Sequence, residues 1–180
     1  MSVKTSRKSV TPTMEYSSEK SLDNLFMDML KDIYYAEKKI AKALPKMVKA
    51  SQCEKLSTAF EDHLQETHGQ LERLEEIFEI MGKKPVGKKC PAIEGILEEG
   101  DEIMKEFKGS RALDAGLIAA AQAVEHYEIG RYGTLRAWAL ELGYMDAVKL
   151  LEKTLKEETM CNEHLTEMAD GGYNELARAA

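Results

Sequence analysis

Residues 30–44 read LKDIYYAEKKIAKAL, in which apolar side chains recur every three or four positions, as on one face of an α-helix. Glu37 falls inside this apolar row, between Ile33 and Ile40. An ionised carboxylate without a partner in a dry core costs several kcal/mol, or it takes up a proton. The alternative is a position at the edge of the row, from which the carboxylate reaches water. The stretch therefore predicts a core-facing helix with one acidic side chain at an apolar position.

The same anomaly recurs in two further helical patterns. Glu125 and Glu128 lie one turn apart in the run AQAVEHYEI (residues 121–129), and Glu158 is in line with Leu155 and Leu165. Two carboxylates at this spacing on a buried face repel each other unless a positive charge lies between them. Carboxylates that converge from different helices are the ligands of dinuclear metal sites in helical bundles, and hard oxygen ligands suit Fe, Mn or Mg.

The paired glutamates and the aromatic residues around them also fit simpler interpretations. One of the two glutamates could stay protonated, or it could form an ion pair with Arg131 or Arg136. Four tyrosines at the same levels could bond the carboxylates or serve redox chemistry, but plain core packing is the favoured interpretation. These tyrosines are Tyr34, Tyr35, Tyr127 and Tyr132.

The second helical pattern offers a weaker set of candidates. Glu66 lies at the flank of the apolar row, where its functional interpretation is a bridging or chelating carboxylate. His63 and Gln70 lie one turn on either side of it and are candidate metal ligands, or hydrogen-bond donors to the ligands. For His63 the favoured interpretation is a position behind the ligands or on the surface.

Two residues that follow Glu158 could complete a coordination sphere. Cys161 and Asn162 come three and four positions later, on the same side of the helix. A small buried cysteine is common in helical cores and needs no metal, and this is the favoured interpretation for Cys161.

Composition limits the classes of function. The chain has 180 residues, which suits one domain, and its net charge of −7 argues against general binding of nucleic acid. No window is apolar enough for a membrane span, and the N-terminus lacks the apolar region of a secretory signal. The three cysteines do not form a disulfide framework, which favours a reducing, cytoplasmic setting.

The order of the elements predicts an all-α fold. No run alternates β-branched and polar residues as a strand does. Two hairpins of long helices, joined by a long connection with its own short helix, are typical of a ferritin-like four-helix bundle. We expect a flexible N-terminal tail at 1–20, the bundle at 21–170 and a C-terminal tail at 171–180. The helices are expected at about 21–51, 54–81, 92–107, 112–142 and 145–169.

Four motifs in the same order make the chain similar to a known family. They read DIYYAEK (32–38), HLQETHGQ (63–70), AAAQAVEHYEI (119–129) and LLEKTLKEE (150–158). In these runs the chain resembles the bacterial YciE/YciF stress proteins, and the resemblance spans about residues 21–170.

The resemblance implies a rubrerythrin-related fold, a homodimer and expression under stress. It also implies a set of metal ligands, one or two from each long helix. The chain departs from the usual di-iron pattern because it lacks Glu-x-x-His: the positions of the two histidines hold Gly69 and Cys161. The implied ligands are Glu37, Glu66, Glu125, Glu128 and Glu158.

Two functions remain open at this point. The first is a stress-associated protein that binds a dinuclear Fe or Mn centre and reacts with a small oxidant, peroxide or dioxygen, as an oxidase or peroxidase does. The second is a non-enzymatic helical stress protein with a weak or vestigial metal site, which acts by dimerisation or by binding a partner. The in-row glutamates favour the first function, and the missing histidines favour the second.

Overall fold

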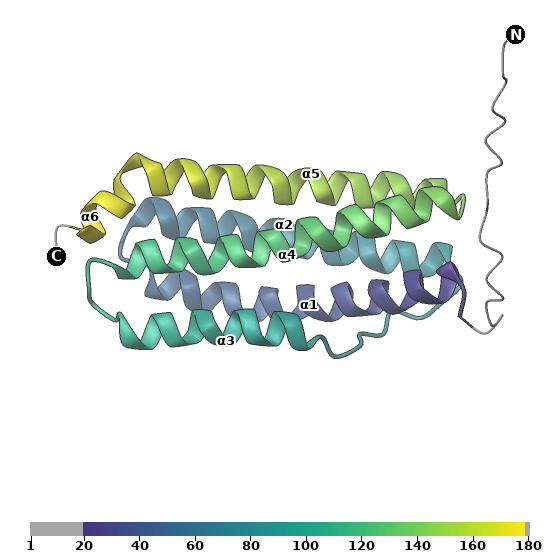
Figure 1. The fold of residues 1–180 in the computed structure, drawn as a ribbon, viewed down its shortest axis with the longest axis horizontal. Helices are drawn as coiled ribbons and strands as arrows, with labels where there is room; N and C mark the ends of the chain where they lie inside the picture. Colours follow the sequence, from purple (N-terminus) through teal and green to yellow (C-terminus); the bar gives the residue numbers. More distant parts are fainter. Residues whose placement is uncertain (1–19, 179–180) are drawn as a thin grey trace, which may run out of the picture.

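The computed structural model describes residues 20–178, and every regular element in that range is a helix (Figure 1). The predicted all-helical class is therefore confirmed, and the bounds of the five predicted helices agree closely with the observed ones. The five helices are α1 (Leu22–Ala50), α2 (Glu54–Ile80), α3 (Pro91–Glu106), α4 (Leu113–Glu141) and α5 (Met145–Met168).

The chain begins and ends its helices with local signals. Ser21 caps α1: its hydroxyl accepts a bond from the Asn24 amide, and the Asn24 side chain accepts one from the Ser21 amide. Gly82 follows α2 and Gly143 follows α4, both with positive φ (63° and 78°), which glycine adopts without steric cost. Pro45 lies inside α1, which continues to Ala50.

The four long helices lie side by side along the molecule, and α3 packs against α1 and α4 (Figure 1). Helix α1 contacts α2 and α4, and α5 contacts the same two helices from the other side. Each long helix therefore has two long neighbours, so a wide stripe of its surface is buried. The apolar core runs along the line where these stripes meet.

The C-terminal segment differs from the expected tail. After α5 the chain makes a π-helical turn, η1 (Ala169–Tyr173), with a kink at Gly172, and then a short helix, α6 (Asn174–Arg178). The predicted N-terminal tail (1–20) lies outside the described residues except for Lys20, as do residues 179–180. Within residues 20–178, no helix is both long enough and apolar enough to cross a membrane.

Candidate metal centre

Four glutamates meet in the middle of the core. Glu37 comes from α1, Glu125 and Glu128 come from α4, and Glu158 comes from α5, and each has 0% of its surface exposed. The interpretation of Glu37 as an edge residue that reaches water is therefore wrong. Full burial of all four carboxyl groups in one place is energetically costly unless protons or cations neutralise them.

Neutral polar side chains hold two of the four carboxyl groups. The Tyr132 hydroxyl donates a hydrogen bond to Glu37 Oε1, and the Gln70 amide donates one to Glu158 Oε1. Both donors are themselves buried, so these bonds fix the carboxyl groups without adding charge. Core packing alone, the favoured interpretation of Tyr132, is thus corrected.

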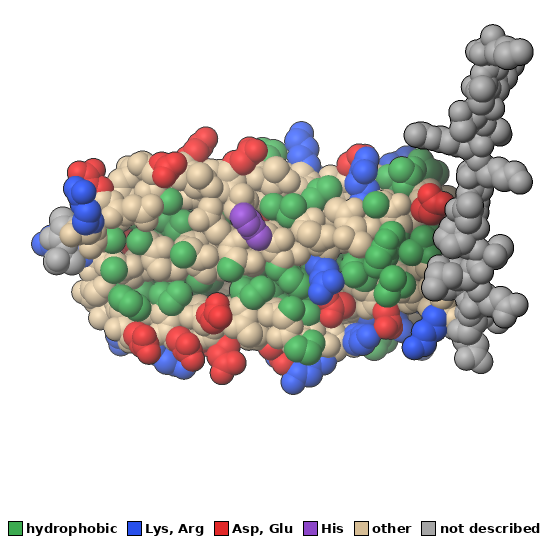
Figure 2. Space-filling view, viewed as in Figure 1, with side chains coloured by type: hydrophobic (Ala, Val, Ile, Leu, Met, Phe, Trp, Pro, Cys, Tyr) green, Lys and Arg blue, Asp and Glu red, His purple; other side chains and the backbone are tan. Residues whose placement is uncertain are grey.

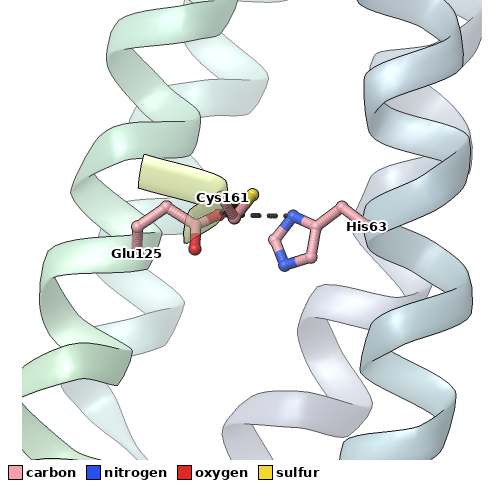
Figure 3. A group of neighbouring side chains, drawn as sticks. All are labelled: His63, Glu125 and Cys161. Carbon is pink, nitrogen blue, oxygen red and sulfur yellow. Dashed lines mark hydrogen bonds and ion pairs between the residues drawn. The ribbon is translucent and has the colours of Figure 1, made fainter. Parts of the chain in front are cut away.

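Around Glu125, two side chains from other helices approach one of its carboxyl oxygens (Figure 3). His63 Nδ1 from α2 lies 3.3 Å from Glu125 Oε1, and the Cys161 thiol from α5 donates to the same oxygen over 3.3 Å. His63 is only 4% exposed, so of its two favoured positions the one on the surface is wrong, while a position behind the ligands stays a prediction. Nitrogen and sulfur therefore join the carboxylates around Glu125.

Several buried polar atoms of the cluster have no partner within the described part of the chain. Native proteins satisfy nearly all such atoms, and those left over indicate a missing ligand, an ion or a water. The acceptors here point to a cation, because a cation can satisfy carboxylate oxygens from several helices together. The unpartnered atoms are Glu37 Oε2, His63 Nε2, Gln70 Oε1, Glu125 Oε2, both carboxyl oxygens of Glu128, and Glu158 Oε2.

The proton affinities of the carboxyl groups reflect the same crowding. Burial raises the pKa of Glu37 to about 7, against the bonds from Tyr132 and Glu128, which lower it. Burial, followed by the charges of the neighbouring glutamates, also raises the pKa of Glu128 and the pKa of Glu158 well above the ordinary value. Without a cation, Glu37, Glu128 and Glu158 therefore retain protons to higher pH than an ordinary glutamate, and a cation displaces those protons.

The donor atoms fit a metal ion. One atom each from His63, Glu125, Glu128 and Glu158 lies within 4.8 Å of the others, and so do one atom each from His63, Glu125 and Cys161. Carboxylate and imidazole ligands at such spacing are compatible with Fe or Mn. The coarse prediction of a carboxylate-rich metal-binding group is thus compatible with the structure.

The remaining candidates lie at different distances from the cluster. Glu66 is exposed on α2 and is not among the converging atoms, although partial burial and nearby Glu157 raise its pKa. Asn162 is half-buried and accepts a bond from Gln122 over 3.4 Å. Gln70 donates a hydrogen bond to Glu158, which agrees with one of its two predicted roles, that of a donor to the ligands.

The arginines considered as partners of the α4 glutamates lie elsewhere. Arg131 Nε lies 3.7 Å from Asp32 Oδ2, and Arg136 Nη2 lies 2.8 Å from Glu152 Oε1. These contacts engage both cations away from the buried carboxyl groups. The interpretation of Glu125 and Glu128 as members of ion pairs with these arginines is therefore wrong.

The other tyrosines also bond outside the cluster. Tyr34 donates to Glu75 over 2.7 Å, Tyr35 donates to Glu94 over 2.5 Å, and Tyr127 donates to Asp32 over 2.8 Å. Among the four predicted tyrosines, Tyr132 is the one that bonds a buried glutamate in the structure. The sequence contained one indication of this contact: Tyr132 follows Glu128 by one helical turn in α4 and so lies on the same face as the buried glutamate.

Comparisons with known proteins agree over almost the whole chain. The family DUF892, described as a domain of unknown function, matches residues 21–178. Escherichia coli (strain K12) protein YciF is 45% identical over 159 residues, which make up 88% of this chain and 96% of YciF.

Solved structures agree in fold. The crystal structure of the E. coli stress protein YciF is 46% identical, has a TM-score of 0.82, and covers 86% of this chain and 98% of its own. YcfI from Rhodopseudomonas palustris is 47% identical, with a TM-score of 0.80. The match covers 84% of this chain and 98% of the YcfI chain. A protein from Xanthomonas campestris pv. campestris is 19% identical, with a TM-score of 0.66, and the match covers 86% of this chain and 97% of that protein. At this identity the likeness concerns the fold alone.

Proposed function

The chain belongs to the DUF892 family, and from this membership and the buried cluster we propose that it is a ferritin-like stress protein that binds a dinuclear Fe or Mn centre. The description of YciF as a stress protein supports the first part of this proposal. Four long helices with one helix in the long connection support a ferritin-like four-helix bundle.

The observation that carries the proposal is the set of unpartnered oxygens on Glu37, Glu125, Glu128 and Glu158. Two divalent cations would balance the charge of four ionised carboxylates. These four residues and His63 would hold the metal. Glu66, which lies at the edge, would join them only if its side chain turned inward.

The protein contributes a fixed and dry surrounding for the metal. Tyr132 orients Glu37, and Gln70 orients Glu158, so the carboxyl groups are held in place before an ion binds. When bound, the metal pair supplies redox chemistry on peroxide or dioxygen. The homodimer, the small oxidant substrate and the cytoplasmic location stay predictions.

One observation favours the second function, a stress protein with a weak site. The positions that hold histidine in a usual di-iron bundle are Gly69 and Cys161. His63 partly offsets this loss, because it brings one imidazole to Glu125 from the turn before Glu66. We therefore propose metal binding as the function of the cluster and treat catalysis as a separate property that needs its own test.

Metal analysis tests the proposal. Protein purified without a chelator is expected to carry about two Fe or Mn ions per chain, and Glu37→Ala and Glu128→Ala are expected to lose them. Glu163→Ala, at an exposed position on α5, is the matched control and should retain the metal. Protein that is isolated metal-free and takes up neither ion would refute the proposal. Peroxide consumption by the iron-loaded protein then tests for an enzyme.

A further inference from the structure

The two ends of the buried cluster differ in their chemistry. Glu37 lies beside Glu128 and accepts a bond from Tyr132, so the donor atoms next to Glu37 are oxygens. At the other end Glu125 meets the imidazole of His63 and the thiol of Cys161. A metal pair bound along this line would therefore experience two unlike surroundings.

Cys161 reaches this end from a separate helix. It lies one turn after Glu158 on α5, and its sulfur is within 4.8 Å of a ligand atom of His63 and of Glu125. Figure 3 shows the three side chains pointing toward one another from α2, α4 and α5. A cysteine that merely fills space would face apolar groups, whereas this thiol faces a carboxylate and an imidazole.

A second observation at the same place points to a ligand. His63 Nε2 and Glu125 Oε2 are buried and have no hydrogen-bond partner among the described residues. The two side chains are 4% and 0% exposed, so bulk water does not satisfy these atoms. The residues His63 and Glu125 form one group with the Cys161 sulfur, which separates this position from an isolated cysteine.

We propose that Cys161 releases its thiol proton to solvent when a cation binds and holds the metal as a thiolate together with His63 and Glu125, and that this N/O/S position takes a borderline cation such as Fe²⁺, Co²⁺ or Zn²⁺. The inference rests on the proposed metal-binding function and adds the choice of ion at one of its positions. Sulfur and imidazole select such ions, while an oxygen-only position suits Mn²⁺ or Mg²⁺. The centre is thus asymmetric, with its softer end at Cys161.

Cobalt titration of the full-length, metal-stripped protein tests this inference. A thiolate ligand gives Co²⁺ an intense near-ultraviolet charge-transfer band, which Cys161→Ser is expected to abolish while weakening Co²⁺ binding by on the order of 10- to 100-fold. Mn²⁺ affinity is expected to stay unchanged. Cys53→Ser is the control, since Cys53 is the N-cap of α2, roughly 15 Å from His63 along the helix axis, and contacts Tyr173.

X-ray absorption of the zinc-loaded wild-type protein gives an independent reading that needs no variant. A sulfur neighbour at about 2.3 Å from zinc supports the inference, while nitrogen and oxygen neighbours alone overturn it. Bound Co²⁺ without the band, or an equal loss of Mn²⁺ and Co²⁺ affinity in Cys161→Ser, also overturns it but leaves the proposed function standing. Wild-type protein that binds none of these ions overturns both.

Discussion

Glu37→Gln is expected to stabilise the metal-free protein at neutral and alkaline pH. Burial raises the pKa of Glu37 from 4.5 to about 7, so the folded state holds this proton more tightly than the unfolded state does. The resulting stability is fully present below about pH 4.5 and is lost as the pH rises through about 7, a loss of about 3 kcal/mol. Glutamine keeps the shape of the protonated acid and does not titrate, so the variant avoids that loss.

The measurement is urea or thermal unfolding of wild type and variant in the presence of a chelator. At about pH 8 the gain of about 3 kcal/mol corresponds to a rise in Tm of roughly 6–12 °C for a chain of this size. At about pH 5 the expected gain falls below about 1 kcal/mol, since Glu37 is then mostly protonated in the folded state. Adding Fe²⁺ or Mn²⁺ should reverse the order, because the variant loses a ligand.

Glu163→Gln, which changes the same chemical group at an exposed position, is the control and should leave the pH profile as it is in wild type. A Glu37→Gln variant that is less stable than wild type at about pH 8 would refute the account of the buried carboxylates. Parallel pH profiles for wild type and Glu37→Gln would refute it equally, because they would show that Glu37 does not titrate in this range.

Two more perturbations test the packing and the bonds around the centre. Tyr132→Phe removes the hydroxyl that lowers the pKa of Glu37, so the metal-free protein should lose about 1–3 kcal/mol at about pH 8; an unchanged unfolding curve would show that this bond carries no weight. Gly130→Ala should stabilise α4 by about 1 kcal/mol, because a Cβ there meets nothing within 4 Å. Gly116→Ala should destabilise by about 1–3 kcal/mol, since its Cβ would lie 2.7 Å from Ile103 Cγ2; equal effects of the two glycine changes in unfolding would contradict the packing of α3 on α4.

The helices themselves could be predicted because their signals are local. Ser21 with Asn24, and the glycines after α2 and α4, mark helix ends within a few residues of sequence. The placement of Glu37 and Glu158 within apolar rows was enough to predict their burial, since one face of a helix turns inward as a whole. The C-terminal helix α6 was missed because five residues are too few to show a period.

The face of α2 was harder to predict. Its apolar row suggested that His63 and Gln70 lie at a flank with Glu66, yet His63 and Gln70 are buried and Glu66 is exposed. Helix α2 packs against both α1 and α5, so its buried stripe is wider than its apolar residues alone indicate. His63 and Gln70 lie on this additional buried part of α2 and face the cluster of glutamates. On the face shown in Figure 2, by contrast, charged side chains lie mainly along the upper and lower edges, and hydrophobic side chains occupy much of the middle.

The sequence by itself determined the class of fold and the four in-row glutamates, because helical period and end signals are properties of neighbouring residues. The tertiary structure decided which partners those glutamates have: Tyr132 for Glu37, Gln70 for Glu158, and His63 with Cys161 for Glu125. Most of these contacts join residues far apart in the chain. They depend on the rotation of each helix against its neighbours, which no local pattern specifies.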